Sequence, residues 1–307
     1  MSMAKSQANL NETQTKNNTA ETHSTTIPQV TEKDEFCSPE FLDPNARLPR
    51  IQALRGTTSQ TCGYFISVDQ MANAGWMDFD DKQLITYTFE SSGAEEKGIL
   101  IQNPRMLVCP KSPVLGFDRK QSQEPNSSTI ILGKYTLEMK EDENIGNLQY
   151  FQVFLLDKNN QPLHQIPLTY KAMGANQASF ATHWQEFCKE LNTCHSIING
   201  IPAKQKNTLF YSLGIFCFKT AREQAGTKQK SFACKVVEHE TPTLETWQNY
   251  FVGFKADVKN YVWESLEPNK PMAIPGLDNL NNLLLPGAVE TVGISPANSS
   301  ELDKLPY

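Results

Sequence analysis

The side chains that most often carry out chemistry in enzymes are scattered along this chain. None of its 5 histidines lies in an HExxH motif, and its 7 cysteines form no CxxC pair. The nearest candidate metal ligands lie around one predicted helix: His183, Cys188, Cys194 and His195. On a helix, positions 183 and 194 are three turns apart along the axis, so we expect these side chains not to converge on a metal. The sequence predicts no metal site and no other cofactor.

Three aspartates in the stretch WMDFDDKQ are a second possible source of chemistry. Asp78, Asp80 and Asp81 could hold divalent cations, because two-metal nucleases need converging carboxylates. Three acids in one polar turn more often face solvent. The chain also contains no GxSxG motif, no P-loop and no dinucleotide fingerprint. We therefore expect no catalysis and keep a metal-dependent nuclease as an alternative.

Charge is distributed unevenly along the chain. Overall it has 28 Lys and Arg against 34 Asp and Glu, a formal net charge of −6. Basic and acidic residues number 3 and 7 in 1–44, 23 and 21 in 45–262, and 2 and 6 in 263–307. From Lys204 to Lys235 the count is seven basic to one acidic. The net charge therefore describes acidic tails on a slightly basic body, and it does not exclude a nucleic-acid partner.

The most basic stretch coincides with a predicted hairpin, LFYSLGIFCFKTAREQAGTKQKSFACKVV at 209–237. Two strands, 208–219 and 231–239, flank a basic loop at 220–230. Strand alternation puts Phe210, Phe216 and Phe218 on one face with very small neighbours, which predicts uncovered rings. Exposed rings beside Lys and Arg are typical of proteins that bind single strands.

A second basic stretch, ARLPRIQALRG within residues 45–56, is interpreted as an arm that tracks phosphates. The predicted nucleic-acid-binding residues are Arg47, Arg50, Arg55, Lys204, Lys206, Phe210, Phe216, Phe218, Lys219, Arg222, Lys228, Lys230 and Lys235. Aromatic residues and Arg also mark protein interfaces. The alternative hypothesis is therefore a structural or assembly subunit that uses the same hairpin to bind protein.

The elements that must position this hairpin follow from hydrophobic periodicity. Strands are predicted at 64–68, 84–90, 98–109, 129–138, 148–156 and 162–170. A helix is predicted over 177–194 and a closing helix from Thr241-Pro242 to about Glu267. This order predicts an α+β, β-rich fold, with an OB-like antiparallel barrel elaborated by extra strands and two amphipathic helices. An elaborated sandwich or an α+β sheet would give much the same pattern.

Composition divides the chain into three parts. Residues 1–44 are predicted to be a disordered tail, 45–263 a β-rich body, and 264–307 a flexible linker with an acidic tip. No signal peptide and no run of about 18 apolar residues is found, so we expect no membrane association. An odd number of cysteines without CxxC pairs favours a cytoplasmic location. Because the aromatic residues and Arg of the hairpin could also form a protein interface, the chain could bind a second copy of itself as a homo-oligomer.

The last residues, PANSSELDKLPY, resemble the tip of bacterial single-stranded DNA-binding proteins. In that family, acidic residues followed by an aliphatic residue, proline and an aromatic residue dock into replication and repair enzymes. The matching positions are Glu301, Asp303, Leu305, Pro306 and Tyr307. Lys304 interrupts the acidic run and Tyr307 replaces the usual Phe. The resemblance implies recruitment of a replication or repair protein through the tip.

Four motifs carry a second resemblance, which spans about residues 45–255. LPRIQALRGTT, CGYFI, NPRMLVCPKSP and PTLETWQNYFVG are similar to an uncharacterised family found mostly in cyanobacteria and their plasmids or phages. The resemblance implies kinship with genes of mobile elements, where single-strand binders are common. The sequence as a whole thus predicts a non-enzymatic protein of the replication or recombination type that binds single-stranded DNA or RNA.

Overall fold

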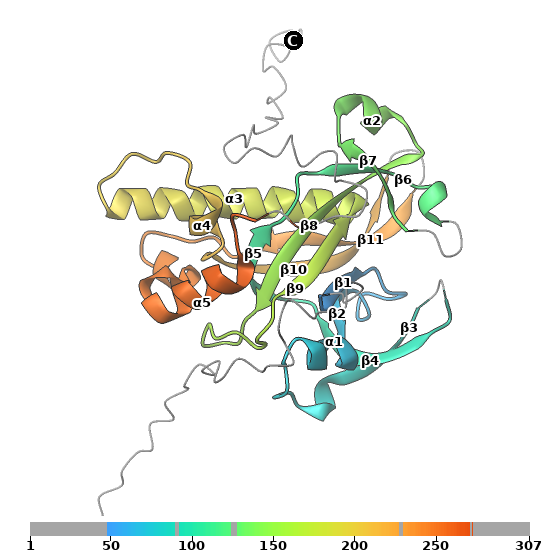
Figure 1. Cartoon of the computed structure of the whole chain (residues 1–307), viewed down its shortest axis with the longest axis horizontal. Helices are drawn as coiled ribbons and strands as arrows, with labels where there is room; N and C mark the ends of the chain where they lie inside the picture. The colour runs from blue at the N-terminus through green and yellow to red at the C-terminus, as the bar shows by residue number, and fades with distance from the viewer. Residues whose placement is uncertain (1–47, 90–91, 124–127, 227–229, 271, 273–307) are drawn as a thin grey trace, which may run out of the picture. The chain divides into compact units, whose positions relative to one another are not determined.

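The structure is a computed structural model, and it describes residues 48–89, 92–123, 128–226, 230–270 and 272 (Figure 1). Its strands are β1 (Arg50–Leu54), β2 (Gly63–Ser67), β3 (Leu84–Thr88), β4 (Glu95–Ile101), β5 (Arg105–Pro110), β6 (Leu115–Asp118), β7 (Ile130–Lys134), β8 (Ile145–Leu155), β9 (Leu168–Met173), β10 (Ile215–Ala225) and β11 (Ser231–His239). The α-helices are α1 (Val68–Asn73), α2 (Leu137–Glu141), α3 (Gly174–Ile198), α4 (Thr208–Tyr211) and α5 (Ala256–Leu266). Short 3-10 turns are η3 (Asp81–Gln83), η4 (Gln121–Gln123), η5 (Trp247–Tyr250) and η6 (Val252–Phe254).

The strands form one large sheet in the order β11-β10-β5-β8-β9-β1-β2-β4-β3, with β6 and β7 attached beside β8. Every pairing is antiparallel except that of β1 with β9. Within the described residues no pairing joins β3 to β11, so the sheet is open. The α+β, β-rich class is confirmed, whereas the predicted OB-like antiparallel barrel is not confirmed, because the sheet does not close.

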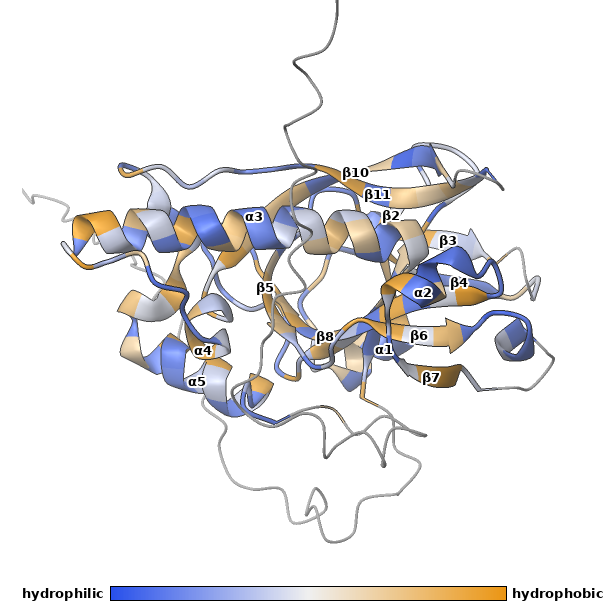
Figure 2. Cartoon of the chain, turned by 90° about the horizontal axis from the view of Figure 1, so that it is seen from above, coloured by the Kyte–Doolittle hydropathy of each residue, from blue (hydrophilic) through white to orange (hydrophobic). Residues whose placement is uncertain are grey.

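Two helices cover opposite faces of the central strands (Figures 1 and 2). Strand alternation separates neighbouring residues of β8: the Phe151 ring packs 5.0 Å from Phe180 of α3, while Phe154 packs 5.8 Å from Tyr261 of α5. The predicted amphipathic stripe of α3 is confirmed, since Phe180, Phe187 and Leu191 are all buried. This helix and the sheet enclose the largest part of the hydrophobic core.

Several predicted elements are divided in the structure. The run 98–109 becomes β4 and β5, because the turn at Asn103-Pro104 interrupts it. The run 129–138 becomes β7 and α2, whose first turn is capped by the Thr136 hydroxyl accepting from the Met139 N–H. The predicted closing helix begins only at Ala256, after the two 3-10 turns η5 and η6.

Candidate nucleic-acid interface

The predicted stacking face of the hairpin is buried. Phe216 is 0% exposed and Phe218 is 3% exposed. Both rings meet the Phe180 ring of α3 edge to face, each at a centroid distance of 5.6 Å. Since α3 covers these rings, they cannot accept a nucleobase, and the prediction that Phe216 and Phe218 stack on bases is wrong.

The small residues beside these rings were expected to leave the rings uncovered, but they allow α3 to pack closely on the strand. A Cβ atom on Gly214 would lie 2.9 Å from Leu191 Cδ2 and 3.1 Å from Phe187 Cε1 of α3. Gly214 therefore lets the helix approach the strand closely. Small side chains at this position favour burial of the aromatic rings, not their exposure.

Phe210 does not lie on the strand at all. It belongs to the short helix α4, whose first turn is capped by the Asn207 side chain accepting from the Phe210 N–H at 3.1 Å. Its half-buried ring packs 4.9 Å from Phe251 and 5.0 Å from His195. Phe210 is thus separated from the hairpin and forms part of the packing around η5 and η6.

Two of the predicted phosphate-binding cations are paired with carboxylates. Lys219 Nζ lies 2.8 Å from Glu238 Oε2, and Lys235 Nζ lies 2.7 Å from Glu223 Oε2. The Lys219 hydrogen bond lowers the pKa of the Glu238 carboxyl, and it raises the pKa of Lys219. The basic character of 204–235 is therefore partly neutralised across the hairpin, because Glu238 lies directly opposite Lys219 and Glu223 lies diagonally across from Lys235.

The other predicted cations are dispersed. Lys204 and Lys206 lie between α3 and α4, where the Lys204 carbonyl accepts from the Asn192 side chain in the C-terminal half of α3 at 3.0 Å. The hairpin packs against the N-terminal half of α3, where the Ser179 hydroxyl accepts from the Val236 N–H at 3.1 Å. Arg50 is exposed on β1. Arg47 and Lys228 lie outside the described residues.

One group near the end of the hairpin does combine an exposed ring with cations. Phe232 is 41% exposed, and the Arg222 guanidinium lies 3.5 Å above its ring. Arg222 also donates from Nε to the Gly56 carbonyl at 3.0 Å, which brings the exposed Arg55 to the same region. Lys230 is exposed two residues before Phe232. We call Arg55, Arg222, Lys230 and Phe232 the hairpin surface.

A buried chain of hydrogen bonds holds β11 in place next to the hairpin surface. The hydroxyls of Tyr64 and Tyr170 lie 2.9 Å apart, and Tyr170 donates to the Asn176 side chain of α3. Asn176 in turn donates to the Cys234 carbonyl of β11 at 2.8 Å. Burial raises the pKa of Tyr64 well above its ordinary value, so the chain stays neutral. It connects β2, β9, α3 and β11 in the core.

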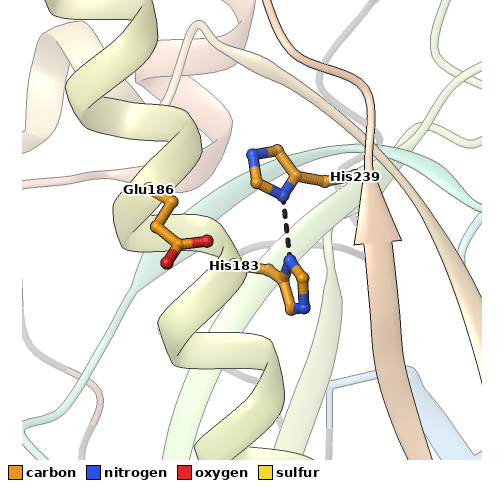
Figure 3. A group of neighbouring side chains, drawn as sticks. All are labelled: His183, Glu186 and His239. Carbon is orange, nitrogen blue, oxygen red and sulfur yellow. Dashed lines mark hydrogen bonds between the residues drawn. The ribbon is translucent and has the colours of Figure 1, made fainter.

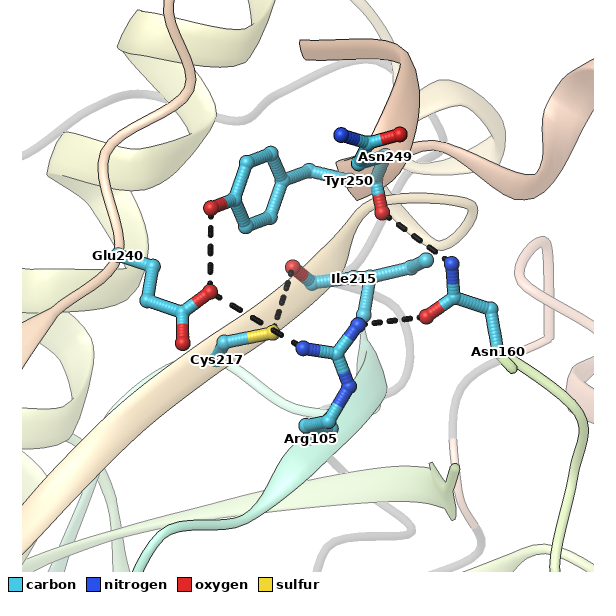
Figure 4. Close-up of polar contacts among 7 residues, drawn as sticks. All are labelled: Arg105, Asn160, Ile215, Cys217, Glu240, Asn249 and Tyr250. Atoms are coloured by element: carbon cyan, nitrogen blue, oxygen red, sulfur yellow. Dashed lines mark hydrogen bonds and ion pairs between the residues drawn. The ribbon is translucent and has the colours of Figure 1, made fainter. Parts of the chain in front are cut away.

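The opposite end of the hairpin is held by a second polar network (Figure 4). Arg105 of β5 donates to Asn160 Oδ1 at 2.6 Å and lies 4.0 Å from Glu240, the residue after β11. Tyr250 donates to the same Glu240 carboxylate at 3.1 Å. Burial and this hydrogen bond raise the pKa of Tyr250 to about 12. Both ends of the hairpin are thus anchored.

The candidates for chemistry do not form the sites considered from sequence. Asp78, Asp80 and Asp81 are exposed, and Asp80 Oδ1 caps η3 by accepting from the Lys82 N–H at 3.0 Å. His195 packs against Phe210, whereas His183 faces His239 of β11 (Figure 3). The tip residues Glu301, Asp303, Leu305, Pro306 and Tyr307 lie outside the described residues.

Sequence reasoning missed Phe232 and His239. Strand alternation places Phe232 on the same face as the apolar Cys234 and Val236, although its position near Lys230 at the hairpin loop leaves its ring 41% exposed. His239 lies 56 residues after His183, and no spacing rule connects the two.

Comparison with known proteins yields one match. Residues 45–282 match the family described as a domain of unknown function (DUF5895). No curated protein and no solved structure matches the chain. Among the described residues, none of the helices combines the length and apolar character that crossing a bilayer requires.

Proposed function

The chain belongs to the DUF5895 family, and we propose that this member binds single-stranded nucleic acid through the hairpin surface without catalysing a reaction. The observation that carries the proposal is Phe232, a 41% exposed ring with a guanidinium 3.5 Å above it. An exposed ring can accept the flat face of an unpaired base, which contributes about 1–3 kcal/mol per base. Arg55, Arg222 and Lys230 supply positive charge for the phosphates.

Geometry favours single strands over duplexes at this surface. Bases in a duplex are stacked on one another, so only an unpaired base offers a face to Phe232. The two anchoring networks reduce the conformational entropy that the hairpin loses on binding. We further propose a cytoplasmic role of the replication or recombination type, in which the tip residues recruit a replication or repair protein.

The test is fluorescence anisotropy with labelled single-stranded and double-stranded oligonucleotides at two salt concentrations. Phe232→Ala should weaken single-strand binding about 5- to 150-fold, equivalent to about 1–3 kcal/mol, and leave its salt dependence unchanged. Lys230→Gln should weaken binding less and lower the slope of log K against log salt by about 1.

Two matched controls accompany these variants. Phe254→Ala removes another exposed ring, and Lys219→Gln removes a lysine already paired with Glu238. Both should bind oligonucleotide as the wild type does. Equal affinity for duplex and single strand, or equal losses in Phe232→Ala and Phe254→Ala, would contradict the proposal.

A second candidate function is an assembly subunit, favoured by an apolar patch elsewhere. Ile197, Ile198 and Ile201 are 57%, 52% and 42% exposed at the C-terminal end of α3, which Figure 2 colours hydrophobic. Exposed aliphatic groups of this kind mark interfaces between copies of a chain. If this function holds, light scattering after gel filtration should detect an oligomer that Ile198→Lys dissociates. A monomeric wild type would exclude it.

A further inference from the structure

Two imidazoles and a carboxylate from distant parts of the chain meet where α3 crosses the end of β11 (Figure 3). His183 Nδ1 and His239 Nδ1 are 2.9 Å apart. Glu186, one helical turn from His183, has its carboxylate turned toward the two rings. One donor atom from each of the three residues lies within 4.8 Å of the other two. No other group of His, Cys, Asp or Glu within the described residues meets this criterion.

A fourth side chain fixes which nitrogen of His239 is available. His239 Nε2 lies 3.2 Å from Glu190 Oε2, and a carboxylate can only accept a hydrogen bond. Nε2 therefore carries the proton, and in the neutral ring the lone pair is on Nδ1, which points at His183. The His239 side chain is 8% exposed, so this orientation is fixed by packing. Metal-binding histidines commonly donate their second N–H to a carboxylate in this way.

We propose that His183, Glu186 and His239 bind one divalent transition-metal ion of the zinc class. Imidazole nitrogen and carboxylate oxygen are ligands that Zn²⁺ accepts, and three protein ligands leave one position for water. This site goes beyond the proposed binding of nucleic acid and does not depend on it.

The distances fit such an ion after a small adjustment. Zn–N bonds of about 2.0–2.1 Å in a tetrahedral site place two nitrogens about 3.3 Å apart. The Nδ1 atoms need to separate by only a few tenths of an ångström from their present 2.9 Å. Glu186 is exposed and can change rotamer to complete the third bond.

An ion bound to His183 and His239 would connect α3 to β11 and so stabilise the fold. His183 belongs to α3, and His239 is the last residue of β11, an outer strand of the sheet. An ion bound to both would add a link between the helix and the edge of the sheet to the contacts of Asn176 with Cys234 and of Ser179 with Val236. Binding to the native state alone would raise the thermal midpoint in proportion to the logarithm of the metal concentration.

Isothermal titration calorimetry of the tag-free, EDTA-treated full chain with ZnCl₂ tests the proposal. We expect one Zn²⁺ per chain and a thermal midpoint that rises with Zn²⁺. His239→Gln and His183→Ala should each remove this binding. Glu190→Gln, which removes only the carboxylate behind His239, should weaken it about 10- to 100-fold.

The control is His195→Gln, which alters a histidine of the same helix that packs against aromatic rings. Its Zn²⁺ affinity should equal that of the wild type. If His239→Gln does not fold, as judged by circular dichroism, the half-exposed His183→Ala variant carries the test. Absence of Zn²⁺ binding by the wild type, or undiminished binding in His183→Ala and His239→Gln, would overturn the proposal.

Discussion

At the residue scale, His164 shows how burial makes one side chain sensitive to acid. Its Nε2 accepts from the Leu155 N–H at 2.9 Å, and its Nδ1 lies 2.8 Å from the Ile166 carbonyl. The ring is neutral in this arrangement, since a protonated Nε2 could not accept. Burial lowers the pKa of His164 from 6.5 to about 4.

This depressed pKa predicts a pH dependence of stability. The unfolded chain takes up the proton near pH 6.5 and the folded chain only near pH 4, so stability falls as the pH drops between these values. The contribution lost by pH 4 is about 3 kcal/mol. Urea denaturation at pH 7 and pH 5 should give a smaller drop for His164→Gln, which keeps a donor and an acceptor but does not titrate. Equal drops in the two proteins would refute the assignment.

At the scale of elements, a buried lysine ends the last helix. Lys111 donates from Nζ to the carbonyls of Glu267 and Lys270, at 2.8 and 2.9 Å, just past the C-terminus of α5. A cation here gives the Glu267 carbonyl at the helix end a second donor, bonds the Lys270 carbonyl just beyond it, and interacts favourably with the helix dipole. Met272 donates back to the Lys111 carbonyl at 3.2 Å, so the packed part of the chain continues beyond the predicted boundary at 263.

Removing this cap should destabilise the fold. Lys111→Met keeps the length of the side chain but removes the Nζ donor from the Lys270 carbonyl and one of the two donors from the Glu267 carbonyl, at a cost of about 2 kcal/mol. Thermal or urea unfolding measures the effect, with Lys120→Met, an exposed lysine, as the control. A loss in Lys111→Met no larger than that in Lys120→Met would argue against the capping role.

Local patterns predicted the elements better than their arrangement. The helix at 177–194 and the strand at 231–239 follow from residues that are near in sequence, and both are confirmed. The open sheet depends on contacts between residues that are distant in sequence. Asn176 of α3 bonds the backbone of Cys234, and Ser179 of α3 bonds the backbone of Val236. These two hydrogen bonds cover the outer edge of β11. The hydrophobic pattern of the hairpin alone does not predict that α3 covers this edge.

The candidate site could be predicted only in part from the sequence, because it too depends on contacts between residues that are distant in sequence. Charge counting correctly placed Lys230 next to the turn of a hairpin, but Arg222, predicted in the loop 220–230, lies within strand β10. It could not reveal that Glu223 and Glu238 pair with the neighbouring lysines, because pairing across strands depends on register. Likewise, Phe216 and Phe232 look alike in sequence, and only the position of α3 decides which ring is buried.

At the scale of the whole molecule, charge separates the family-matched region from the rest of the chain. The full chain has a net charge of −6, of which residues 1–44 contribute −4 and residues 283–307 contribute −2. The matched region 45–282 therefore has a net charge of 0, from −6 + 4 + 2. Net negative charge repels phosphates at long range and slows their approach to any basic surface.

This separation predicts the behaviour of a chain shortened to residues 45–282. At low salt, the shortened chain should bind a single-stranded oligonucleotide more tightly than the full chain, because the repulsion of the flanking acids is removed. The advantage should shrink as salt rises, since the screening length falls to about 8 Å at 0.15 M ionic strength. Anisotropy titrations of both chains across a salt series measure the difference, after matching unfolding midpoints confirm that the shortened chain is folded. Weaker binding by the shortened chain at every salt concentration would place the nucleic-acid contacts in the flanking residues, away from Phe232 and Arg222.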